Sequence, residues 1–184
     1  FPEAIAEKQA AIRFYAERGI PVEVNESHQW SLRDAHDALA VAMAFLAAYN
    51  AKKQGVRHYV QQMMHNTPPS TSPRMDLAKM LAKLDLTKPL EGPEFTVYRE
   101  VRAGITSLPA NEDEAKGHMA ASAVYSMALK PHILHVVGFT EASHVVNPGV
   151  LIESCRIARG AVQLALKGAA DPASDPAVLR RKEV

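Results

Sequence analysis

The sequence predicts an α/β protein of parallel β-α units that form half or part of a (β/α)8 TIM-type barrel. Four short segments rich in β-branched and aromatic residues alternate with longer segments of helical periodicity. The run from Ile133 to Val137 is short and apolar and leads into polar residues and a helix start, which is typical of a buried parallel strand. Regular alternation of this kind implies a parallel sheet with right-handed crossovers.

The strands are expected where apolar residues are concentrated between turn signals. A first helix from Glu3 to Arg18 precedes them and ends at Gly19. The four predicted strands cover residues 20–25, 56–62, 94–102 and 132–137. Residues such as Val22, Phe95 and Val97 supply the side chains that fit a pleated, half-buried surface.

Each helix between or after these strands is expected to begin at a capping residue. The predicted helices start at Ser31, at Ser72 with Pro73, at Asn111, and at Asn147 with Pro148, and they end near Lys53, Leu86, Leu129 and Lys167. Small polar side chains favour such positions because their oxygen atoms accept hydrogen bonds from the first free backbone N–H groups.

The domain organisation that follows is simple. Residues 1–168 are expected to form a single β-α domain that is part of a larger barrel. Residues 169–184 are rich in Pro, Asp and Ser and predict a loose C-terminal tail.

The composition and net charge of the chain argue against several classes of function. The chain of 184 residues is 47% hydrophobic and 22% charged, which suits one globular domain. A net charge of +1 argues against a broad nucleic-acid or membrane-surface footprint. The single cysteine, Cys155, excludes an internal disulfide framework and fits a reducing compartment. No long apolar run or signal peptide is visible, so a cytoplasmic location is expected.

The polar residues that matter most fall where the predicted strands end. Parallel strands would bring the turns at residues 25–30, 63–72, 103–110 and 138–147 to one face. The candidate site residues in or next to these turns are Asn25, Glu26, His28, His65, Asn66, Glu100, Arg102, Glu141 and His144. Histidines and carboxylates on one rim suit acid-base work or metal binding, but no tight ligand spacing is present, so no metal site is predicted.

Short stretches of the chain resemble a family of cobalamin enzymes. The run Val137-Gly138-Phe139-Thr140-Glu141-Ala142 leads into a polar turn and the helix that starts at Pro148. This region resembles the late strand and helix of the catalytic barrel subunit of glutamate mutase, and the matching part of lysine and ornithine aminomutases. Upstream segments occur in the order of that family, at residues 19–25, 38–51, 55–60 and 75–80.

The resemblance implies the C-terminal half of the barrel of an adenosylcobalamin-dependent radical isomerase acting on a small amino acid. In that family the cobalamin is held mainly by a separate domain or subunit, and pyridoxal phosphate is a second cofactor in the aminomutases. Glu141 would lie where the family places a carboxylate near the ribose of the adenosyl group. We expect His144, Asn25, His65 and Asn66 on the cofactor face, and Glu26, His28, Glu100 and Arg102 on the substrate face.

Two other functions fit the same pattern. The chain could be a non-catalytic half-barrel that scaffolds an assembly, or a metal-dependent hydrolase or lyase that uses His28, His65 and His144. If the chain is half a barrel, its first and fourth strands would be unpaired. A second copy or the rest of the barrel is therefore expected as a partner.

Overall fold

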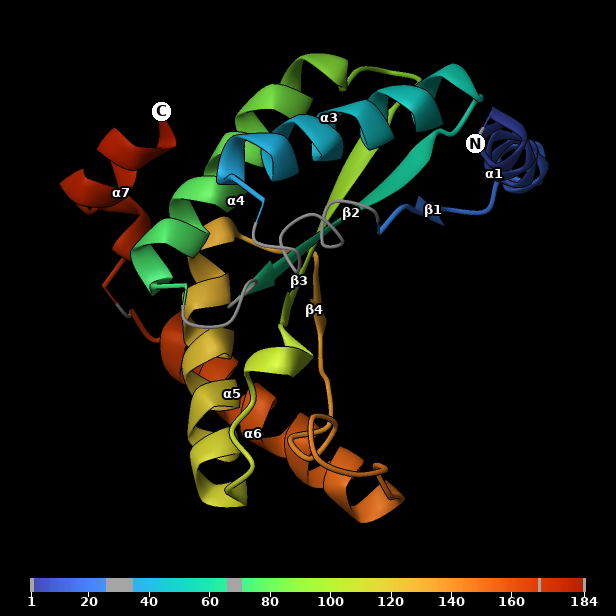
Figure 1. Cartoon of the computed structure of the whole chain (residues 1–184). Coiled ribbons are helices and arrows are strands. Elements are labelled where there is room, and N and C mark those ends of the chain that lie inside the picture. The colour runs from blue at the N-terminus through green and yellow to red at the C-terminus, as the bar shows by residue number, and fades with distance from the viewer. Residues whose placement is uncertain (1, 26–34, 66–70, 169, 184) are drawn as a thin grey trace.

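The chain folds into a four-stranded parallel sheet with helices between the strands (Figure 1). The computed structural model describes residues 2–25, 35–65, 71–168 and 170–183. The strands run in the order β1-β2-β3-β4, with bounds Val22–Glu23, His58–His65, Thr96–Ala103 and Ile133–His135. All three strand pairings are parallel, so the predicted α/β fold of a partial barrel is confirmed.

The helices of these units are α1 (Pro2–Ala16), α3 (Asp37–Lys53), α4 (Pro73–Thr87), α5 (Glu112–Ser126), α6 (Pro148–Leu166) and α7 (Pro176–Lys182). Helices α3, α4 and α5 cover one side of the sheet, and no described helix covers the other side (Figure 1). None of the described helices combines the length and apolar character needed to cross a bilayer.

The core lies between this helical layer and the sheet. Alternate residues of a strand point to opposite faces. On β2, Tyr59 and Met63 therefore face the helices: Tyr59 stacks on Phe95 at 5.9 Å between ring centroids, and Met63 packs with Leu77 and Met80 of α4. Gln62, between them in sequence, belongs to the opposite face, which we call the open face.

Three predicted helix caps are confirmed. The Ser72 hydroxyl accepts from the backbone N–H of Met75 at 3.3 Å, and the Asn147 side chain accepts from that of Val150 at 3.0 Å. Asn111 accepts two backbone N–H groups in the first turn of α5. These caps use only residues two or three positions apart, which is why local sequence predicted them.

The helix expected to start at Ser31 begins later. Ser31 lies outside the described residues, but Ala35 and His36 are not helical and α3 starts at Asp37. His36 has an extended backbone, and its ring Nδ1 accepts from the N–H of Ala38 at 3.1 Å. A histidine therefore serves as the cap, a role that the sequence pattern did not suggest.

The C-terminal segment differs from the loose tail that the sequence predicted. Helix α7 packs against α4 and buries Val178, which is 1% exposed, in the cluster around Leu77. Asp175 caps this helix by accepting from the N–H of Ala177 at 2.7 Å. The Asp-Pro pair at residues 175 and 176 is thus a helix start, so the folded unit extends beyond residue 168.

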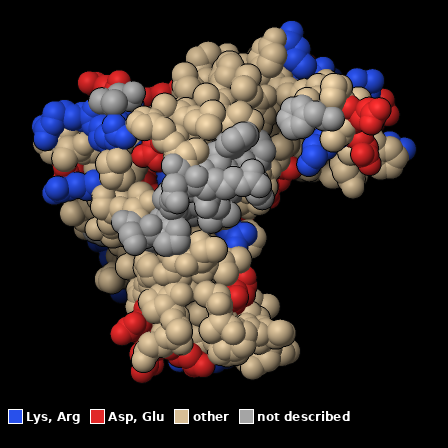
Figure 2. Space-filling model, viewed as in Figure 1, with Lys and Arg blue, Asp and Glu red and all other residues tan. Residues whose placement is uncertain are grey.

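Charge is distributed unevenly over the surface. Figure 2 shows Lys and Arg side chains gathered at the α7 end of the visible face and acidic side chains at the opposite end, over α5 and α6. Side chains of both charge signs also lie at the α1 end of this face.

Candidate functional site

The carboxyl ends of the four strands point to the same edge of the sheet because all the pairings are parallel. The candidates Glu26, His28 and Asn66 lie outside the described residues. Asn25 is exposed just beyond β1. The remaining candidates divide between the open face, the core and the turn after β4.

On the open face, one polar side chain from each strand contacts the polar side chain of the next strand. We call this row of four residues the polar ladder: Glu23, Gln62, Glu100 and His135. The Nε2 of Gln62 donates to Oε1 of Glu23 at 2.6 Å and to Oε1 of Glu100 at 3.1 Å. The Nδ1 of His135 lies 2.9 Å from the same Glu100 oxygen. Each contact crosses between neighbouring strands, so the ladder spans the whole sheet.

The two carboxylates beside Gln62 determine which way its side-chain amide is turned. Its side-chain NH2 group has two hydrogens, and both are directed at carboxylates, so exchanging the amide N and O atoms would set oxygen against oxygen. The amide oxygen Oε1 is then buried and has no hydrogen-bond partner among the described residues. Gln62 is only 5% exposed. An additional donor on the open face would find an acceptor here.

Burial and neighbouring charges change the pKa of Glu23 in the ladder. The pKa of Glu23 is raised above its ordinary value of 4.5, first because nearby protein atoms remove part of its hydration and next because of the negative charge of Glu100. The charges of His135 and Arg102 oppose this rise. Burial and a second carboxylate thus both disfavour the ionised form of Glu23.

Glu100 and Arg102, both expected on the substrate face, belong to the open face together. Glu100 is 6% exposed and lies at the centre of the ladder. Arg102 is partly buried and pairs in register with His135. The open face therefore carries groups of both charge signs.

His65 is a core residue and does not reach the open face. It is the last residue of β2, and its ring Nε2 lies 3.2 Å from the Ser126 hydroxyl of α5 on the helical side. Burial, followed by the charges of Lys79 and His118, lowers the pKa of His65 to about 4. Strand alternation decides this placement, because His65 is three positions beyond Gln62. The expectation that His65 belongs to the cofactor face is corrected accordingly.

Glu141 closes the turn that follows β4. Its carboxylate Oε1 accepts from the backbone N–H of Gly138 at 2.6 Å, and its own N–H donates to the Gly138 carbonyl at 3.0 Å. Glu141 is exposed. His144 is exposed as well, with Nδ1 2.9 Å from the Ser143 hydroxyl and Nε2 4.0 Å from Glu112 of α5. Both candidates therefore lie on one surface turn, held by local contacts.

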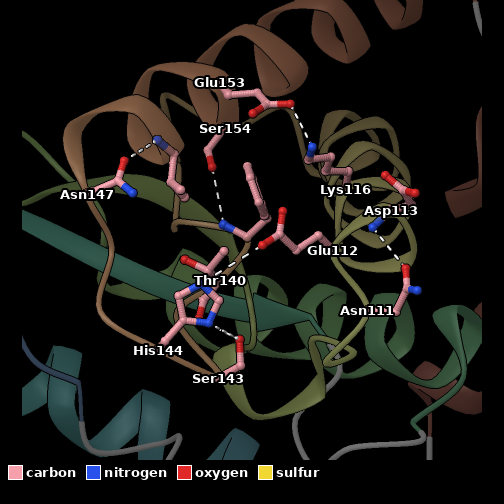
Figure 3. A network of polar contacts seen from close by, with 12 residues as sticks. Asn111, Glu112, Asp113, Lys116, Thr140, Ser143, His144, Asn147, Glu153 and Ser154 are labelled. Atoms are coloured by element: carbon pink, nitrogen blue, oxygen red, sulfur yellow. Dashed lines mark hydrogen bonds and ion pairs between the residues drawn. The ribbon is translucent and has the colours of Figure 1, made fainter.

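Helices α5 and α6 hold this turn from two sides (Figure 3). The Phe139 N–H donates to the Ser154 hydroxyl of α6 at 3.2 Å. Lys116 of α5 lies 4.7 Å from the centroid of the Phe139 ring and 2.8 Å from a carboxylate oxygen of Glu153. The backbone that positions Glu141 is thus fixed by helices on both sides.

The sequence pattern did not indicate Glu23, Gln62 and His135 as site residues. The available signal was a polar residue at alternate positions inside otherwise apolar strands, as at Val22-Glu23-Val24. That signal does not say which polar residues meet, because strand register is a tertiary property.

The histidines proposed for a metal-dependent hydrolase or lyase do not gather in the described structure. His28 is outside it, His65 is buried against α5, and His144 is on the surface turn after β4. Across residues 2–25, 35–65, 71–168 and 170–183, no group of three His, Cys, Asp or Glu side chains is placed to hold a metal ion.

Comparison with protein-family models and with curated proteins finds no match to this chain.

Proposed function

We propose that this chain is the half-barrel component of an adenosylcobalamin-dependent radical isomerase of the amino-acid mutase or aminomutase type. The observation that supports the proposal most directly is the exposed carboxylate of Glu141, which Gly138 holds at the exit of β4. This turn carries the residues that resemble the glutamate mutase barrel. Its partners would be a cobalamin-binding domain or subunit and a second set of β-α units.

The chemistry of the turn fits the adenosyl group. A ribose offers two hydroxyl donors, and a carboxylate is an acceptor with two oxygens. The Gly138 N–H occupies Oε1 of Glu141 and fixes the carboxylate, which leaves the second oxygen to accept from a ribose hydroxyl. The cofactor supplies hydrogen-atom abstraction when it is bound, and in an aminomutase pyridoxal phosphate would be the second cofactor.

The residues of this chain would orient cofactor and substrate. Ser154 and Lys116 hold the turn, so that Glu141 keeps one position as a ligand binds. On the open face, Arg102 suits the carboxylate of an amino acid and Glu100 suits its ammonium group. A closed barrel would exclude water from this face and strengthen both interactions.

The first test uses the nucleoside part of the cofactor. We expect 5′-deoxyadenosine to shift the NMR signals of residues 138–144 in the purified chain, and Glu141→Gln to weaken this binding about tenfold, the effect of losing one hydrogen bond to a charged group. Glu114→Gln, on the exposed first turn of α5, is the matched control and should bind like the parent chain.

A second ligand separates ribose recognition from recognition of the base. We expect 2′,3′,5′-trideoxyadenosine, which differs from 5′-deoxyadenosine only in lacking both ribose hydroxyls, to bind the parent chain as weakly as 5′-deoxyadenosine binds Glu141→Gln. Equal binding of the two nucleosides by the parent chain would contradict the role given to Glu141. The proposal would also fail if no signal of the turn shifted with either nucleoside.

A further inference from the structure

We infer that the part of the polar ladder formed by Glu23, Gln62 and Glu100 is a binding site for a primary ammonium group. The inference rests on the proposed function for the source of that group, the amino-acid substrate, and it deepens that proposal by giving the ammonium acceptors on three strands. The site itself needs only side chains of this ladder and no cofactor.

The first observation is that two carboxylates lie around one nitrogen atom. The Nε2 of Gln62 is 2.6 Å from Oε1 of Glu23 and 3.1 Å from Oε1 of Glu100. The carboxylates come from β1 and β3, the strands on either side of Gln62 in the sheet. An N–H donor thus already fits between them, and a positively charged donor forms stronger hydrogen bonds with carboxylates than a neutral amide does.

The second observation is a buried acceptor that lacks a donor. Gln62 is 5% exposed, and its amide oxygen Oε1 has no hydrogen-bond partner among the described residues. The amide cannot turn over to satisfy this oxygen, because its NH2 group is directed at the two carboxylates. Buried polar atoms are normally paired, so this oxygen indicates a missing donor next to Glu23 and Glu100.

The third observation is the charge of the site. Within residues 2–25, 35–65, 71–168 and 170–183, neither carboxylate forms an ion pair with a lysine or an arginine, and the partner of Glu100 is the imidazole of His135. Burial and the charge of Glu100 raise the pKa of Glu23, and the charges of His135 and Arg102 offset only part of the rise. A bound cation would complete the compensation of the two negative charges.

These observations favour a primary ammonium group over a cation without donors. Such a group carries one positive charge and three N–H donors. The contacts of the two carboxylates with Gln62 and His135 all use Oε1, which leaves Oε2 of each carboxylate as an acceptor. Together with Oε1 of Gln62, the ladder then offers three acceptors on β1, β2 and β3, one for each N–H group.

The test follows the binding of propylammonium to the purified chain at pH 8 by NMR, with the side-chain NH2 signals of Gln62 as the reporter. We expect these signals to shift saturably. Propyltrimethylammonium keeps the positive charge but has no N–H donor, and it should bind at least about tenfold more weakly. Unshifted Gln62 signals would overturn the inference. Equal affinity for the two cations would also overturn it, because the site would then recognise charge alone.

A pair of variants locates the binding. Glu23→Gln removes one of the two charges and should weaken propylammonium binding about tenfold. Glu23 is exposed, so this change leaves the buried side chains of Gln62 and Glu100 in place. The matched control is Glu94→Gln, at an exposed position just before β3, which should bind propylammonium like the parent chain. Unchanged binding by Glu23→Gln, or the same loss in both variants, contradicts the site.

The comparison of the two cations uses the parent chain, so it decides the inference even where a variant fails to fold. Failure here is also distinguishable from failure of the proposed function. Binding of 5′-deoxyadenosine is measured at Glu141 with another ligand, and either result can be negative while the other is positive.

Discussion

The ring Nδ1 of His135 lies 2.9 Å from the carboxylate Oε1 of Glu100, and this contact ties the edge strand β4 to the centre of the sheet. The same oxygen accepts a hydrogen bond from Gln62 at 3.1 Å. Because a carboxylate can only accept, the ring proton of His135 belongs on Nδ1 in this contact. Glu100 is thus the acceptor for two neighbouring strands.

Replacing Glu100 by alanine should lower the free energy of unfolding by about 1–3 kcal/mol, because the buried amide of Gln62 loses one acceptor and His135 loses its partner. Urea denaturation measures the change. The control is Glu94→Ala, which removes an exposed ion pair with Arg57 and should cost less than about 1 kcal/mol. Equal losses in both variants would show that the ladder adds no stability.

Glu23 should make the fold less stable as pH rises. Its pKa is raised from 4.5 in the folded chain, so the folded state holds more protons than the unfolded state above that pH. The stabilisation is complete below pH 4.5 and is lost as pH rises through the folded pKa. Glu23→Gln should remove this fall and gain stability relative to the parent at higher pH. Urea titrations at several pH values test it, with Glu7→Gln on the exposed side of α1 as control.

His65 should make the fold less stable as pH falls, which is the opposite direction to Glu23. Its pKa falls from 6.5 to about 4 on folding, so the unfolded chain binds more protons between these values. Stability should therefore be complete above pH 6.5 and decline by roughly 3 kcal/mol as pH falls to 4. His65→Gln should flatten this part of the stability curve. The control variant His58→Gln, at an exposed position, should show the same decline in stability as the parent chain.

Gly138→Ala should destabilise the turn that holds Glu141. A Cβ atom at this position would lie 2.5 Å from Cγ2 of Val146, closer than side-chain atoms approach one another. We expect a loss of about 1–3 kcal/mol in thermal denaturation, and recovery of much of it when Val146→Ala is added.

Gly117→Ala is the matched control for this glycine. Gly117 is an exposed residue of α5 with no atom within 4 Å of the added Cβ. It should be neutral or gain up to about 1 kcal/mol, because alanine favours a helix. A stable Gly138→Ala variant would mean that the turn is not tightly packed.

Val178→Ala should weaken the packing of α7 against α4. Val178 is 1% exposed in the cluster with Leu77 and Met80, and losing its methyl groups should cost about 1–2 kcal/mol. We expect faster amide hydrogen exchange over residues 176–182. Leu179→Ala, at a position that is 42% exposed, should leave exchange nearly unchanged. Rapid exchange of α7 in the parent chain would instead favour a loose tail.

Local sequence determined the order of the elements and many of their ends. Apolar periodicity predicted the four parallel strands, and the caps at Ser72, Asn111 and Asn147 were predicted where they occur. These features depend on contacts between residues a few positions apart. The cap at His36 and the packing of α7 were missed, because the first uses an uncommon capping residue and the second depends on a distant partner helix.

Only the tertiary structure decided which polar residues meet. Glu23, Gln62, Glu100 and His135 are far apart in sequence, and the register of three strand pairings aligns them on one face. The same alternation turns His65 to the helical side, although its place at the end of β2 favoured the rim. A one-residue shift in register would exchange the two faces, and the spacing of residues in the sequence does not indicate the register.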